Sequence, residues 1–136
     1  MKKSGSDPKL RLSFVLWIMA AHSFLVGTGL IIQLPEVMEW FGFLPGHEKF
    51  FSAQGGVFHV VMAVGYALAA LNSLRFRCLI QFSIFVKAAA TLFLLFYYVF
   101  IDSITLVLIS GIGDGVFGVA LYLSFISYNQ HQKINT

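Results

Sequence analysis

The sequence predicts an all-α integral membrane protein, a four-helix bundle, and three observations lead to this fold class. Apolar residues make up 58% of the 136 residues, whereas charged residues make up only 11%. A soluble domain carries about 25% charged residues, and so short a chain has no core large enough to bury this much apolar surface. The apolar residues also gather in four segments, each long enough to cross about 30 Å of hydrocarbon as a helix.

The four expected helices cover about residues 12–33, 55–71, 76–101 and 104–127, and residues 34–54 form an outer loop between the first two. The first segment, LWIMAAHSFLVGTGLIIQLP, is longer than the apolar region of a cleaved signal peptide and lacks a small-residue cleavage site. We therefore expect it to stay in place as a helix, with the GTG at 27–29 as a packing feature. The whole chain, 1–136, is expected to be a single transmembrane domain.

The basic residues predict the orientation of the bundle. Seven of the nine stand before the first helix, between the second and third, or after the fourth: Lys2, Lys3, Lys9, Arg11, Arg75, Arg77 and Lys133. The outer loop holds only Lys49, against three glutamates. The positive-inside rule then places both termini in the cytoplasm. The net charge of +3 is attributed to topology and to anionic lipid, not to nucleic acid.

The outer loop is expected to contain a short amphipathic helix on the outer membrane face. Pro35 suits a first helical turn, and Glu36 and Glu39 favour its positive end. Trp40 would sit in the aromatic belt, and Gly42 with the PG at 45–46 would end the helix. Such a helix either caps the bundle or forms a lid over a cavity that opens outward.

Three helices place a titratable group near the middle of the membrane, at depths of about 16 to 19 Å from their outer ends. These groups are His22, Lys87 and Asp114. Because a lone charge at the bilayer centre is costly, we expect Lys87 and Asp114 to form a buried ion pair. Ser83, Lys87 and Thr91 recur at a spacing of four and define one polar stripe. Whether the pair is structural or functional is left open by the sequence.

Small residues surround the expected position of the carboxylate. Ser110, Asp114 and Gly118 share one helix face, and Gly111 and Gly115 form a small-xxx-small pair beside it. We expect this surface to let a neighbouring helix approach closely.

The histidines raise the question of a cofactor. Two histidines in separate helices can ligate one haem, but His22 and His59 differ in expected depth by about 10 Å. We therefore predict no cofactor, with haem or quinone as minor alternatives, and interior hydrogen bonds from His22 to Asp114 or Ser23 and from His59 to Gln54 or Tyr66. No metal-binding motif occurs, and the single Cys78 excludes an intramolecular disulfide.

The layout resembles a known family. It consists of a basic start, a first helix ending in GLIIQLPEVMEWFGF, an outer loop leading to FFSAQGGVFHVVMAVGYALAA, an Arg-bearing turn and two closing helices. This is similar to the small four-helix DoxX-like membrane proteins, including their BphX-like relatives. The resemblance implies attachment to redox or catabolic systems of bacterial inner membranes. The chain lacks a cysteine pair, so thiol chemistry does not carry over, and no catalytic residue transfers by position.

Two functions of different class follow. The first is a non-enzymatic accessory or packing protein held by Lys87, Asp114 and the glycines, whose partners are the lipid bilayer and either another membrane protein or a second copy of the chain. The second is a binding site beneath the outer loop for a small lipophilic molecule, a quinone or hydrophobic metabolite. His59, Gln54 and Tyr66 would form its entrance and His22, Lys87 and Asp114 its floor, with Thr91 and Ser110 nearby. The sequence favours a protein that is not an enzyme.

Overall fold

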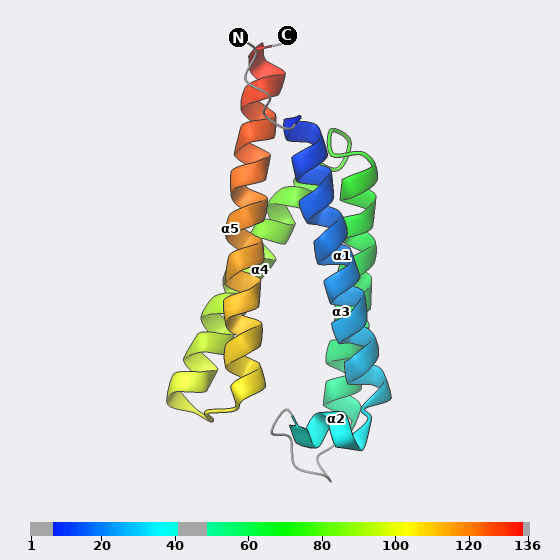
Figure 1. Ribbon diagram of the computed structural model, residues 1–136, viewed down its shortest axis with the longest axis vertical. Coiled ribbons are helices and arrows are strands. Elements are labelled where there is room, and N and C mark those ends of the chain that lie inside the picture. Colours follow the sequence, from blue (N-terminus) through cyan, green and yellow to red (C-terminus); the bar gives the residue numbers. More distant parts are fainter. Residues whose placement is uncertain (1–6, 41–48, 135–136) are drawn as a thin grey trace.

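The computed structural model describes residues 7–40 and 49–134, and within them the chain is helical without strands. The helices are α1 (Pro8–Ile32), α2 (Pro35–Trp40), α3 (Lys49–Leu71), α4 (Arg77–Phe100) and α5 (Thr105–Ile134), as shown in Figure 1. Four of them, α1, α3, α4 and α5, are long and apolar enough to cross a membrane. The predicted all-α class is thereby confirmed, as are four helices long and apolar enough to span a membrane.

Local capping sets both ends of α1. The Asp7 side chain accepts a hydrogen bond from the backbone N–H of Lys9 at 3.0 Å, and Pro8 opens the first turn. Both features favour a helix start, so α1 begins earlier than the apolar segment that predicted it. At the other end Gln33 adopts a left-handed conformation with φ of 52°, and its backbone N–H donates to the carbonyl of Gly29.

Two other helices also exceed their expected bounds. α3 begins at Lys49 rather than near residue 55, and α5 continues to Ile134 rather than ending near 127. The added stretches, KFFSAQ and YNQHQKI, are more polar than the segments that predicted these helices, but they contain no proline or glycine to break a helix. The expected end of α2, at residues 42–46, lies outside the described residues, and its place on a membrane face stays a prediction.

The spanning helices form two sequential hairpins. α1 packs along α3 and α4 packs along α5, while α1 meets α5 less extensively and α3 meets α4 least. Figure 1 shows the hairpins close together near the start of α1 and diverging towards α2 and the α4–α5 turn. The start of α1, the end of α5 and the α3–α4 turn lie at the same end of the molecule.

The core lies in the part of the fold where the two hairpins converge. Its buried apolar residues come from α1, α3, α4 and α5 and include Leu12, Leu16, Met19, Tyr66, Ala69, Ile80, Leu121 and Phe125. The outward faces of the helices carry large exposed apolar side chains, among them Phe14, Phe24, Phe85, Phe96 and Val99. An apolar exterior of this kind is typical of helices that contact lipid.

Candidate functional site

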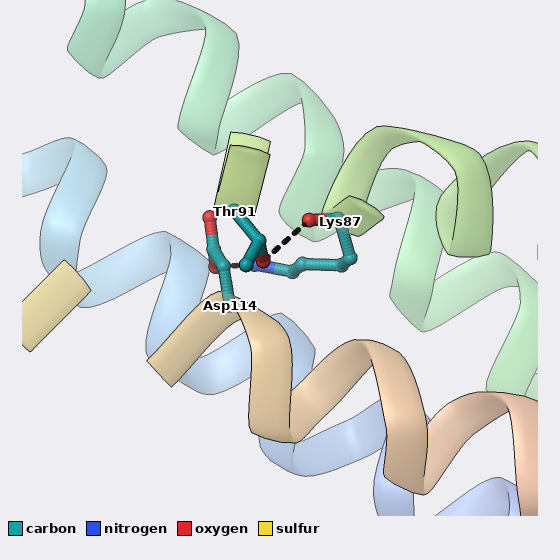
Figure 2. Close-up of polar contacts among 3 residues, drawn as sticks. All are labelled: Lys87, Thr91 and Asp114. Atoms are coloured by element: carbon teal, nitrogen blue, oxygen red, sulfur yellow. Dashed lines mark hydrogen bonds and ion pairs between the residues drawn. The ribbon is translucent and has the colours of Figure 1, made fainter. Parts of the chain in front are cut away.

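The predicted pair of charges is present between α4 and α5. Nζ of Lys87 donates a hydrogen bond to Oδ1 of Asp114 and forms an ion pair with it, as Figure 2 shows. Lys87 is 3% exposed and Asp114 7% exposed, so both charges are removed from the surface. Burial of two opposite charges in contact avoids the much larger cost of burying either alone.

The hydroxyl groups beside Lys87 on α4 bond to their own helix. Oγ1 of Thr91 donates to the carbonyl of Lys87 at 2.8 Å, which Figure 2 also shows, and Oγ of Ser83 donates to the carbonyl of Leu79 at 2.7 Å. Serine and threonine hydroxyls often donate to the backbone carbonyl four residues earlier in this way inside membrane helices. The predicted polar stripe therefore exists, but only Lys87 uses it to reach another helix.

The glycines of α5 bring α4 close to the carboxylate. A Cβ atom on Gly118 would lie 3.2 Å from Cβ of Lys87, and one on Gly115 would lie 3.3 Å from Cγ2 of Thr91. Gly111 meets Leu94 in the same way, at 3.2 Å. The small residues of α5 therefore allow the close approach of α4, which is the helix that carries Lys87.

Two aromatic rings border the lysine. Nζ of Lys87 lies 5.9 Å from the ring centroid of Tyr66 on α3 and 5.7 Å from that of Phe117 on α5. These distances fall within the range of cation–π attraction. The ammonium group is consequently held by one carboxylate and two rings, from two different helices.

A pocket of about 270 Å³ lies next to the ion pair. Residues of all four spanning helices line it. The polar ones are Ser23, His59, Tyr66, Lys87 and Asp114, and the apolar ones are Phe58, Met62, Val86, Ala90, Phe93 and Leu94. Apolar walls with a few converging polar groups are the usual composition of a small-molecule site.

A second hollow, of about 400 Å³, lies along the α4–α5 pair. Lys87 and Asp114 line it too, together with Thr91, Gly115 and Gly118. The ion pair therefore borders two hollows. The 270 Å³ pocket is lined by residues of α1, α3, α4 and α5, whereas the 400 Å³ hollow is lined by residues of α4 and α5 alone.

The expected pocket residues divide into two groups. His59 and Tyr66 line the 270 Å³ pocket, as their spacing of seven on α3 suggested, but Tyr66 is 1% exposed and lies beside Lys87 rather than at an entrance. Gln54 is exposed and Ser110 is half-buried, and neither lines either hollow. Thr91 lines only the hollow between α4 and α5.

His22 does not line the pocket. Its ring packs against Phe117 with a centroid distance of 5.0 Å, and its Nδ1 is buried with no hydrogen-bond partner among the described residues. The expected hydrogen bonds from His22 to Asp114 or Ser23 do not occur. The neighbouring Ser23 lines the pocket instead, a role that the sequence reasoning missed.

His59 lies further along its helix than the depth estimate assumed, because α3 begins at Lys49. It shares the pocket with Lys87 and Asp114, although its expected depth differed from that of His22 by about 10 Å. The hydrogen bond expected from His59 to Gln54 or Tyr66 is not formed. In the described part of the chain, no three His, Cys, Asp or Glu residues are placed to share a metal ion.

Comparisons with protein families, with curated proteins and with solved structures found no match to this chain. The resemblance to DoxX-like proteins therefore stays a prediction.

Proposed function

We propose that this protein is a non-enzymatic membrane protein that binds a small lipophilic molecule, such as a quinone or another hydrophobic metabolite, in the pocket beside Lys87 and Asp114. The observation that carries the proposal is the convergence of five polar side chains from four helices on an otherwise apolar pocket. Polar groups are expensive inside a membrane, and their concentration in one place by default indicates a functional site.

The charge distribution supports an orientation for the site. Basic residues stand at the end of the molecule that holds the start of α1, the α3–α4 turn and the end of α5: Lys9, Arg11, Arg75, Arg77 and Lys133. We propose that this end faces the cytoplasm of a bacterial cell. His59, on the half of α3 nearer α2, would then mark the outer side of the pocket.

The experiment is to purify the protein in mild detergent from its own membranes and to record an absorption spectrum and a native mass spectrum. We expect a retained small molecule, seen as an added mass. His59→Leu should lose that mass, whereas the matched change Gln54→Leu, at an exposed position outside the pocket, should retain it. A protein that always arrives without a bound molecule would contradict the proposal, and a Soret band would identify the molecule as haem.

A second candidate is an accessory protein that packs against another membrane protein or a second copy of itself. The observation in its favour is that Lys87, Asp114 and the α5 glycines already form a close helix–helix contact, which needs no ligand to account for it. In that case the ion pair would only fix the register of α4 on α5. The double substitution Lys87→Met with Asp114→Leu tests this role, because a purely structural pair can be replaced by two apolar side chains.

A further inference from the structure

Three polar side chains of the pocket form no hydrogen bond with any described residue. These are Ser23 on α1 and His59 and Tyr66 on α3. Ser23 and Tyr66 are each only 1% exposed. Ser73, Ser83 and Thr91 behave differently, because each donates to the carbonyl four residues earlier. Since buried polar groups are normally paired, the three open groups of the pocket are available to a bound molecule.

The charges of the pocket cancel. Among the described residues that line it, Lys87 and Asp114 are the only Lys, Arg, Asp or Glu, and they pair with each other. A charged ligand would find no free counterion among these side chains, and an uncompensated charge in an apolar environment is strongly unfavourable. The pocket therefore suits an uncharged ligand that offers hydrogen-bonding atoms.

The apolar wall indicates the size and the route of the ligand. An engineered protein cavity of about 150 Å³ holds benzene, so a pocket of about 270 Å³ takes one ring with a short substituent. Phe58 on α3 and Phe93 on α4 line the pocket yet are 63% and 62% exposed, so they stand at its mouth. Because α3 and α4 diverge from their shared turn (Figure 1), this mouth faces the side of the bundle.

Resting on the proposed function, we propose a specific class of ligand: an uncharged, ring-sized amphiphile with a hydroxyl or carbonyl head. The head bonds to Ser23, Tyr66 and His59 beside the ion pair, and the apolar part extends between α3 and α4. The ligand therefore enters sideways from the bilayer and not from water.

Four probes with one skeleton test the head group: 4-pentylphenol, pentylbenzene, 4-pentylbenzoate and 4-pentylbenzylammonium. Binding is measured by the shift in thermal unfolding midpoint over a range of probe concentrations in an uncharged detergent, with concentrations corrected for partition into the micelles. We expect 4-pentylphenol to bind about tenfold more tightly than pentylbenzene, because its hydroxyl pairs with open groups. The two charged probes should bind more weakly still.

Matched variants locate the binding. Ser23→Ala and Tyr66→Phe should each reduce the preference for the phenol over pentylbenzene to about threefold or less, whereas Ser83→Ala, whose hydroxyl bonds within α4, should leave it unchanged. Ala90→Phe would fill the α4 wall of the pocket and abolish phenol binding. Ala88→Phe, two residues away on the other hollow, should not affect it.

The outcomes separate this inference from the proposed function. Equal binding of the phenol and pentylbenzene, or a preference that survives both Ser23→Ala and Tyr66→Phe, would overturn the hydrogen-bonded head. Tightest binding of the benzoate or the benzylammonium would overturn the uncharged class. Either result leaves a lipophilic site in place. If no probe shifts the midpoint, both the ligand class and the lipophilic site are refuted.

Discussion

Gly27 and Gly56 face each other where α1 crosses α3, and neither position has room for a side chain. A Cβ on Gly27 would lie 2.7 Å from the carbonyl oxygen of Gly56, and a Cβ on Gly56 would lie 2.6 Å from the carbonyl oxygen of Gly27. The first hairpin is thus held by direct contact between two backbones. Close contacts of this kind are a main source of helix association in membranes, where the hydrophobic effect contributes little.

Alanine at this crossing should separate the two helices. We expect Gly27→Ala or Gly56→Ala to lower the free energy of unfolding by about 1–3 kcal/mol, because backbone atoms cannot move aside as a flexible side chain can. Gly29→Ala is the matched control, since nothing lies within 4 Å of its Cβ position. Denaturation in mixed micelles followed by circular dichroism measures both; an equal effect at residues 27 and 29 would contradict the crossing.

Removal of Lys87 should destabilise the protein, because the buried carboxylate of Asp114 loses its partner. We expect Lys87→Met to destabilise the protein by about 3 kcal/mol or more, because Asp114 is then left charged without a partner or has to take up a proton. The measurement is the free energy of unfolding in mixed micelles.

The double change Lys87→Met with Asp114→Leu distinguishes the two roles of the ion pair. If the pair only holds α4 against α5, the double variant should recover much of the stability lost in Lys87→Met. A double variant as unstable as Lys87→Met would show that the lost stability does not come from leaving the Asp114 carboxylate without its partner. A stable double variant that no longer binds a ligand would assign the pair to the pocket.

The α5 glycines should tolerate alanine less well the closer they lie to α4. Gly118→Ala would place a methyl 3.2 Å from Cβ of Lys87, whereas Gly113 has nothing within 4 Å. We expect a loss of about 1 kcal/mol for Gly118→Ala and no loss for Gly113→Ala, which even gains from the higher helix propensity of alanine. The loss at Gly118 should be smaller than that at Gly56, because a contact at 3.2 Å is relieved by a smaller shift than one at 2.6 Å. Losses of equal size at residues 113 and 118 would contradict the close contact with α4.

The proposed orientation can be tested with the single native thiol. Cys78 is exposed, one residue after the start of α4, at the end of the molecule that carries the basic residues. A membrane-impermeant maleimide should label it only after the membrane is permeabilised. A Cys78→Ser chain with Ser103→Cys, in the exposed α4–α5 turn, should be labelled in intact cells after removal of any outer membrane. The reverse pattern would invert the topology.

The sequence predicts the number of spanning helices well and their ends less well. Hydropathy detects only the part of a helix that is apolar enough for lipid, so the polar ends of α3 and α5 were not included. The Lys87–Asp114 pair was predictable because the cost of an isolated charge leaves few alternatives. No such cost fixes the position of an uncharged polar residue, and this is why the prediction that Gln54 and His22 line the pocket was wrong.

One signal for the missed pocket residue was present in the sequence. Leu16, Ala20, Ser23 and Gly27 recur at spacings of three and four on α1, and all four are buried. A serine on such a stripe, between a small residue and a glycine, lies on the packed face and is directed towards the interior. The lack of a hydrogen bond at its hydroxyl could be recognised only once the surrounding helices were placed.

The pairing of helices bears on how the chain enters a membrane. Residues 12–32 of α1 and 50–71 of α3 contain no Lys, Arg, Asp or Glu, whereas Lys87 and Asp114 belong to the same second hairpin. The charge of α4 is therefore cancelled by the next helix to emerge from the ribosome and not by one already released into lipid. The apolar stretches of each hairpin therefore carry no net charge when they enter the membrane, and the two hairpins need only dock afterwards.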